Sequence, residues 1–107
     1  MHSVFNVTSI AGDYSNKTIT IQTNYIVDES TVNKQNVKLV DASSGTTVIY
    51  KLSTDKDKII ITLKEWPIPN NTYQVNVTFI KDKLGRELVY PLTKEIEFKA
   101  DTKLKAK

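Results

Sequence analysis

The stretch PNNTYQVNVTFIKDKLG, residues 69–85, has turn-forming residues at both ends and a regular alternation of apolar and polar residues between them. A period of two is typical of a β-strand that buries one face, and Pro, Asn and Gly favour the turns that bound such a strand. We expect a strand with Tyr73, Val75, Val77 and Phe79 on its buried face and Gln74, Asn76 and Thr78 on the other.

Runs rich in β-branched residues recur on both sides of this strand, separated by short groups of turn residues. Six further strands are expected, at residues 3–10, 18–25, 36–41, 46–53, 59–65 and 93–100. Short strands at intervals of roughly 8–12 residues are typical of an antiparallel sandwich. The predicted fold is therefore all-β, a Greek-key β-sandwich of about seven antiparallel strands in two sheets.

The segments between and after these strands complete the predicted domain. Residues 11–17 are rich in turn formers and are expected to form the first turn. Asp28 or Ser30 is expected to cap a single helical turn, because both residue types accept hydrogen bonds from free backbone N–H groups. We expect one sandwich domain over residues 1–100 and a tail or linker over residues 101–107.

Tyr73 opens the alternating strand directly after a connection rich in Pro and Asn. In Greek-key sandwiches a tyrosine at the start of strand F packs its ring at the edge of the core, and its hydroxyl bonds back to the connection before it. Buried hydroxyls rarely lack a partner. We therefore predict a structural role for Tyr73, as a tyrosine corner.

Composition excludes several classes of function. The chain has 107 residues and no cysteine, so it has no disulfide framework and no thiol chemistry. Of its 15 basic residues only Arg86 is an arginine, and the lysines are interleaved with 12 acidic residues. Proteins that read nucleic acid concentrate basic residues in a stripe and favour arginine. We expect no nucleic-acid partner.

The sequence carries no sign of insertion into a membrane. No window approaches the 18 or so apolar residues that a spanning helix needs, and the opening MHSVFNVTS lacks the basic and apolar regions of a signal peptide. If the native protein is exported, we expect this chain to be a fragment of a longer one, with Met1 and His2 as candidates for added residues.

Three short motifs resemble those of bacterial Ig-like domains, the family found in surface-layer and other cell-wall proteins and also in phage structural proteins. The matching residues are Thr31, Val32, Asn33, Asn36 and Val37; Pro69, Asn71, Thr72, Tyr73, Val75 and Val77; and Lys81, Asp82, Gly85 and Leu88. The chain departs from the family pattern at residues 89–93, a longer approach to the last strand. The resemblance implies an Ig-like sandwich, a role as a repeated spacer or binding module, and no catalytic residues.

Catalysis and metal binding find no support among the reactive side chains. The only histidine, His2, lies at the chain terminus, whereas a Ser-His-Asp triad needs a rigidly held histidine. The acidic residues flank turns or alternate with lysines, and neither Asp55 with Asp57 nor Asp28 with Glu29 supplies the oxygen ligands of a calcium loop. We expect Asp82 to accept N–H bonds in its own turn. The predictions are no enzyme activity, no metal site and no cofactor.

Two aromatic residues suggest an alternative to a purely structural role. Trp66 lies in the loop-like segment EWPIP, and Tyr14 lies in the first expected turn. Exposed rings of this kind stack on sugars, whereas the structural interpretation has Trp66 cover one end of the sandwich. The alternative function is a carbohydrate-binding module that contacts a glycan through Trp66 and Tyr14.

The leading hypothesis is a non-catalytic Ig-like module of a larger bacterial surface or phage virion protein, which acts as a spacer or a weak adhesion domain. Its expected partners are neighbouring domains of the same polypeptide or assembly, and in the alternative a glycan of the cell envelope. The expected location is extracellular, at the bacterial cell surface or in a virion.

Overall fold

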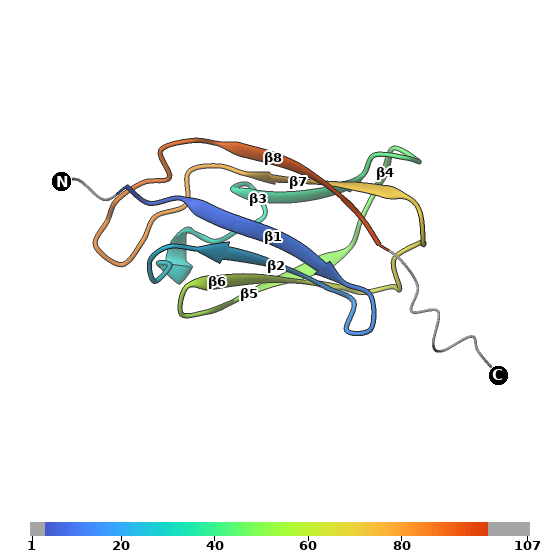
Figure 1. Cartoon of the computed structure of the whole chain (residues 1–107), viewed down its shortest axis with the longest axis horizontal. Helices are drawn as coiled ribbons and strands as arrows, with labels where there is room; N and C mark the ends of the chain where they lie inside the picture. Colours follow the sequence, from blue (N-terminus) through green and yellow to red (C-terminus); the bar gives the residue numbers. More distant parts are fainter. Residues whose placement is uncertain (1–3, 99–107) are drawn as a thin grey trace.

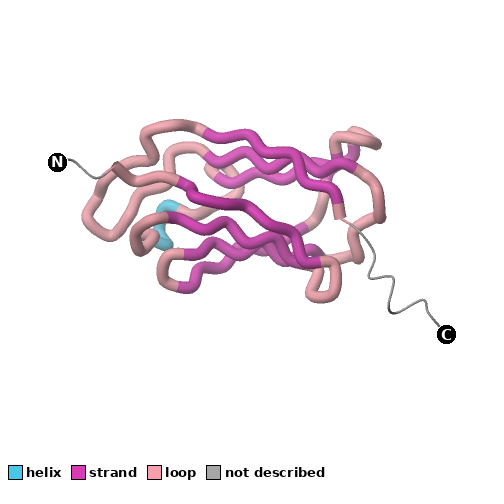
Figure 2. The backbone as a smooth tube through the Cα atoms, viewed as in Figure 1, coloured by secondary structure: helices cyan, strands magenta, loops and turns pink. Residues whose placement is uncertain are grey.

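The computed structural model describes residues 4–98, which form two antiparallel four-stranded sheets that pack face to face (Figure 1, Figure 2). One sheet has the order β1-β2-β6-β5, with β1 at Val7–Asp13, β2 at Thr18–Thr23, β6 at Lys58–Leu63 and β5 at Tyr50–Asp55. The other has the order β4-β3-β7-β8, with β4 at Thr46–Thr47, β3 at Val37–Asp41, β7 at Thr72–Val77 and β8 at Leu92–Glu97. This is the strand order of an Ig-like sandwich with a short extra strand, β4, and the predicted fold class is confirmed.

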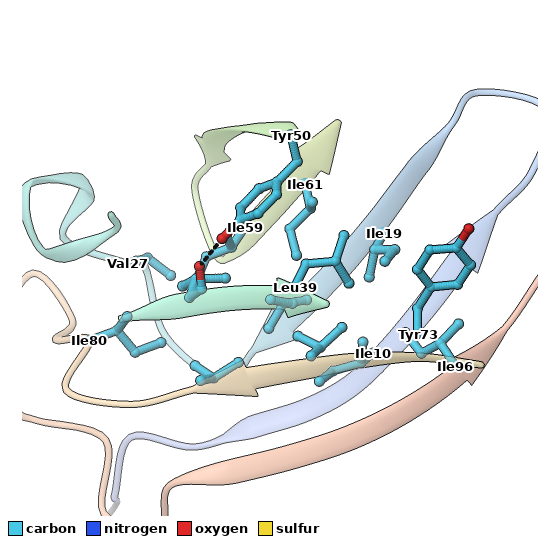
Figure 3. Close-up of a cluster of buried hydrophobic side chains, with 14 of the residues drawn as sticks. Ile10, Ile19, Val27, Leu39, Tyr50, Ile59, Ile61, Tyr73, Ile80 and Ile96 are labelled. Carbon is cyan, nitrogen blue, oxygen red and sulfur yellow. Dashed lines mark hydrogen bonds between the residues drawn. The ribbon is translucent and has the colours of Figure 1, made fainter. Parts of the chain in front are cut away.

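The core lies between the sheets and is built from alternate residues of the central strands. Ile19 and Ile21 of β2 lie opposite Ile61 and Ile59 of β6, and all four are fully buried. In the other sheet Leu39 lies opposite Val75. Figure 3 shows Ile19, Ile59, Ile61 and Leu39 among the side chains of this single cluster. The predicted period of two therefore holds for the central strands.

The helical turn between β2 and β3 is confirmed. It is the 3₁₀ helix η1, Glu29–Thr31. Of the two residues expected to cap it, Asp28 is the N-cap. The Asp28 carboxylate accepts the N–H of Ser30 at 3.0 Å and the Ser30 hydroxyl at 2.8 Å. Both hydrogen bonds lower the pKa of Asp28, and the bond from the Ser30 hydroxyl has the larger effect.

The first strand begins and ends later than predicted. β1 spans Val7–Asp13 instead of residues 3–10, so that Gly12 lies in a strand and not in a turn. A side chain at Gly12 has no room, since a Cβ there would lie 2.9 Å from Cε1 of Phe98. Gly12 therefore allows β1 to approach the end of β8 closely. The composition of residues 11–17, which is typical of a turn, does not reveal this contact.

The predicted strand at residues 46–53 is wrong as one element. Thr46 and Thr47 pair with β3, whereas Tyr50 and the residues after it pair with β6 in the other sheet (Figure 1). The chain changes sheet at residues 48–49. Alternation of side chains has the same period in both sheets, so the pattern gave no signal of this crossing.

Phe79 is the one member of the predicted buried face that points outward. Its φ of +58° puts the backbone in the left-handed region, which is uncommon for a bulky residue. As a result the alternation is reset, Phe79 is 63% exposed, and Ile80 takes the buried position. The Thr78 N–H still donates to the carbonyl of Asn36, one step beyond the last β3–β7 pair of Val37 with Val77, so the alternation is reset directly after this ladder.

The two ends of the described chain lie at opposite ends of an elongated body of 53 × 27 × 22 Å (Figure 1). The Phe5 carbonyl accepts the N–H of Val89 in the β7–β8 connection. The Phe98 carbonyl accepts the N–H of Asn70 in the β6–β7 connection. The predicted tail at residues 101–107, and also Met1 and His2, fall outside the described residues. No helix within residues 4–98 is long and apolar enough to cross a membrane.

Candidate functional site

Trp66 and Tyr14, the two aromatic residues singled out from the sequence, lie side by side at one end of the sandwich. Trp66 belongs to the β6–β7 connection and Tyr14 to the β1–β2 turn, and their ring centroids are 5.4 Å apart with 37° between the planes. The Lys17 Nζ lies 5.2 Å from the Trp66 ring centroid. Trp66 is 54% exposed, so part of its indole remains open to solvent.

A hollow of about 190 Å³ lies beside Trp66, next to the point where the chain changes sheet. Its apolar lining includes exposed Ile49 and Ile68 and buried Leu63. Asp41 and Glu65 are also among the lining residues. The site therefore combines an indole, apolar walls and two acidic residues in a shallow depression.

Tyr73 borders the same hollow, yet it is only 4% exposed. Its hydroxyl accepts the N–H of Ile68 at 2.8 Å, which ties the β6–β7 connection to the start of β7. Its ring meets Phe98 edge to face, with centroids 5.4 Å apart and 83° between the planes. Tyr73 lies at the margin of the buried cluster, beside Ile96 (Figure 3). This geometry suits support of the connection and leaves little of the ring for a ligand.

Asp41 is a buried carboxylate that the sequence reasoning did not single out. It is 3% exposed and accepts the N–H groups of Ser43 and Ser44 and, at 3.1 Å, the side-chain amide of Asn71. Burial acts to raise the pKa of Asp41, but the hydrogen bonds from Asn71, Ser44 and Ser43 outweigh it, and the pKa is lowered. The signal in the sequence was the order Asp-Ala-Ser-Ser-Gly, which favours a turn held by an aspartate side chain.

The opposite end of the sandwich is organised by Asp82, which is 1% exposed. One carboxylate oxygen accepts the N–H groups of Leu84 and Arg86, and the other accepts Nε of Arg86 at 2.7 Å. The expectation that Asp82 bonds within its own turn is confirmed. The Arg86 guanidinium lies 4.1 Å from the Tyr25 ring centroid, so the β7–β8 connection is fixed against the segment after β2.

Large exposed apolar side chains gather in the connections at the two ends. Among the described residues they are Val4 before β1, Val40 in a strand, and, in connections, Ile26, Ile49, Trp66, Ile68, Phe79, Leu84, Val89 and Tyr90. The strands of both sheets otherwise expose polar or small residues to solvent. A partner that binds through apolar contacts would therefore meet the ends of the molecule and not its flat faces.

The described part of the chain brings together no group suited to metal binding. Within residues 4–98 no three His, Cys, Asp or Glu side chains are placed to hold a metal ion. Asp57 is engaged by Lys58 at 3.9 Å, and Asp28 caps η1. His2, the only histidine of the chain, falls outside the described residues.

Comparison with known proteins places this geometry among bacterial Ig-like domains. Residues 6–100 match the sequence profile of the family described as bacterial Ig-like domain. No protein with a curated description matches the sequence.

Solved structures of the bacterial S-layer protein SbsC resemble the chain. Its N-terminal part superposes with a TM-score of 0.77 at 19% identity, over 91% of this chain and 24% of that one. A longer part gives 0.77 and 19% over 92% of this chain and 14% of that one, and its domains 1–6 give 0.76 and 19% over the same shares. The chain thus spans a quarter or less of these solved chains, and the likeness shows the fold alone.

Proposed function

The chain belongs to the family of bacterial Ig-like domains, and from that premise we propose that it is a non-catalytic spacer module of a longer bacterial cell-surface protein. The observation that carries the proposal is that the two ends of the described residues, Val4 and Phe98, lie at opposite ends of a body 53 Å long. A domain entered at one end and left at the other extends a polypeptide by its full length. Its neighbours in the same chain are its proposed partners.

Two further observations support this proposal, one for the setting at the cell surface and one for the spacer role. The similar solved structures come from an S-layer protein, and one of them comprises six domains. The connections at both ends are held by buried carboxylates, Asp41 at one end and Asp82 at the other. Fixed ends suit a module whose work is to keep a defined distance and direction between its neighbours.

The spacer role is tested by small-angle X-ray scattering on two copies of the full chain joined head to tail. The maximum dimension is expected to be roughly double that of one copy, because entry and exit lie at opposite ends. A joined pair hardly longer than a single copy would contradict the spacer role, since the two copies would then lie folded back on each other.

A second candidate function, glycan binding, is favoured by the placement of Tyr14 against Trp66. An exposed indole beside a tyrosine ring offers the flat apolar surface on which a sugar stacks, and Asp41 and Glu65 border the adjoining hollow. In this function the module adheres to a polysaccharide of the cell envelope through this end.

Glycan binding is tested by titrating purified cell-wall polysaccharide while the fluorescence of Trp66 is recorded. Binding would shift the emission and would be lost in Trp66→Ala, as measured by pull-down. Tyr90→Ala is the matched control, because Tyr90 is 69% exposed in the connection at the other end. Absence of binding by the unmodified chain would leave the spacer role alone.

A further inference from the structure

The sandwich has four sheet edges, and three of them carry features that discourage pairing with another strand. β1 has an irregular register between Val7 and Ser9 and lies beside β8. β8 places Lys94 opposite Val75 on its core-facing side, where the lysine stays exposed. β4 is only two residues long.

β5 is the exception. Its six residues, YKLSTD, contain no proline, and their pairing with β6 is regular from end to end. No other strand among the described residues pairs with its second side. A regular strand edge of this length is a template for a further strand.

The hydrogen-bonding groups of this free edge follow from the register. The Lys64 N–H donates to the carbonyl of Ile49, and these residues lie opposite each other in continuation of the β5–β6 pairing. Because bonded and non-bonded pairs alternate in antiparallel ladders, Lys51, Ser53 and Asp55 turn their backbone groups toward β6. Leu52 and Thr54 turn theirs outward, where residues 4–98 offer them no partner.

The sequence of β5 is complementary to itself in one antiparallel register. Pairing centred on Ser53 sets Leu52 opposite Thr54 of a second copy, so that the outward-facing groups of both strands meet. The same register sets Lys51 opposite Asp55 of the second copy, twice by symmetry. Both side chains are exposed, and neither forms an ion pair within the described residues.

Neighbouring registers lack this match. A shift by one residue sets outward-facing groups opposite groups already bonded to β6, so no ladder forms. A shift by two in one direction sets Lys51 opposite Ser53. In the other direction it sets Leu52 opposite Lys56, which lies in the turn with a φ of +58°.

We propose that two copies of this chain associate through antiparallel pairing of β5 about a two-fold axis at Ser53. The two sheets then form one continuous sheet, with Lys51 of each copy paired to Asp55 of the other. A hollow of about 380 Å³, lined by Glu29, Val32 and β5, gives room for the inward side chains of the added strand. The interface is isologous, so it closes with two copies.

Sedimentation velocity of the full chain over a range of concentrations up to about 1 mM tests the association, since a single strand pair makes a small and weak interface. The unmodified chain is expected to shift from monomer to dimer as its concentration rises. Asp55→Lys would place two positive charges opposite each other, at position 55 of each copy and Lys51 of the other. This repulsion is expected to weaken the dimer by about tenfold or more. The double variant Lys51→Asp with Asp55→Lys restores opposite charges and is expected to restore the dimer.

Two further variants separate this edge from the rest of the surface. Thr54→Pro removes an N–H that points away from β6, so it is expected to preserve the fold and abolish the dimer. Glu97→Lys makes the same change of charge on exposed β8 and is expected to leave the dimer intact. Circular dichroism checks that each variant is folded.

Two results would overturn the proposal. One is a chain that stays monomeric at about 1 mM. The other is a dimer that persists unchanged in Asp55→Lys and Thr54→Pro, because association would then use another surface, such as the apolar side chains at the ends. Either result would leave the spacer role intact, which depends on the positions of the chain ends.

Discussion

At the scale of single residues, the hydroxyl of Tyr73 has a defined task. It accepts the Ile68 N–H in a connection interrupted by two prolines, where no strand pairing satisfies that group. The bond is partly shielded from solvent, and a shielded N–H that loses its acceptor destabilises the folded chain by more than a typical hydrogen bond stabilises it. The Tyr73 hydroxyl is therefore one anchor of this connection, beside the bonds from Asn70 to the Phe98 carbonyl and from Asn71 to Asp41.

Replacing Tyr73 with Phe should lower the free energy of unfolding by about 1–2 kcal/mol, because the Ile68 N–H loses its acceptor while the ring stays packed. Urea unfolding followed by circular dichroism measures the change. Tyr90→Phe is the control and should stay within about 0.5 kcal/mol, since Tyr90 is exposed. Equal effects of the two substitutions would refute the structural role of Tyr73.

Asp41 couples the same end of the molecule to pH. Its pKa in the folded chain lies below the ordinary value of 3.8, because the hydrogen bonds from Asn71 and the serines outweigh its burial. A carboxyl with a lowered folded pKa stabilises the fold above its unfolded pKa, and this contribution is lost as the pH falls through the folded value. Acid should therefore weaken the β3–β4 turn.

Asp41→Asn should flatten the acid side of the stability profile. The unmodified chain loses the Asp41 contribution as the pH falls below 3.8, whereas the variant has no proton to bind at this position. Thermal unfolding at a series of pH values from neutral downward measures the difference. If both proteins lose stability in parallel below pH 4 or so, Asp41 is not a source of the acid dependence.

Single residues also mark what sequence reasoning reaches. Trp66, Tyr14 and Tyr73 were identifiable by type and by position relative to turns. The contact between Tyr14 and Trp66 was not predictable, because it requires the β1–β2 turn and the β6–β7 connection to meet at one end. Phe79 was misplaced because a left-handed backbone at a bulky residue leaves no mark in the alternation.

At the scale of elements, the connection between β7 and β8 is long but well anchored. Asp82 accepts three hydrogen bonds within it, and Leu88 donates to the carbonyl of Ile80 across it. The exposed Leu84 at its tip therefore stands on a fixed support. The Gly85 that follows has a φ of +83°, a conformation that glycine adopts without strain.

Removing this anchor should loosen the connection and also destabilise the fold. Asp82→Ala leaves two N–H groups and the Arg86 guanidinium without their shared acceptor, so we expect a loss of about 3–5 kcal/mol. Hydrogen exchange at the amides of Leu84 and Arg86 should become faster.

Asp28→Ala is the matched control for Asp82→Ala, since it removes an aspartate that caps a turn at a less buried site. The loss of stability is expected to be much smaller than for Asp82→Ala, because the Asp28 carboxylate stays accessible to solvent. Unchanged exchange at Leu84 and Arg86 in Asp82→Ala would show that the connection is held by other contacts.

Elements differ in how well the sequence predicted them. β2, β6 and β7 were placed well because each buries one face against the other sheet, which imposes a strict alternation. The division of residues 46–53 into β4 and β5 was missed, since a change of sheet is a tertiary event. The bounds predicted for β1 were too early, because glycine is a typical turn former and the sequence does not reveal that Gly12 packs against Phe98.

At the scale of the whole molecule, both sheets contribute to one core. Its buried members come from strands and connections throughout the described chain, from Phe5 to Phe98. Neither sheet can keep its apolar face covered without the other. Small domains with one core usually unfold in a single cooperative step.

We therefore expect unfolding curves from two probes to coincide. Far-ultraviolet circular dichroism reports the strands, and the fluorescence of Trp66, the only tryptophan, reports the end that carries the hollow. Coincident midpoints in urea indicate a single transition. An earlier change in fluorescence would mean that the β6–β7 connection opens before the core does.

The opposite placement of the chain ends also decides how the fold meets tension. A pull on the two ends acts on β1 at one end of the body and on β8 at the other, along the directions of the strands (Figure 1). The ladder bonds of β1 to β2 and of β8 to β7 lie across that direction. They are therefore loaded in shear and must yield together, whereas bonds at a peeling edge would yield one at a time.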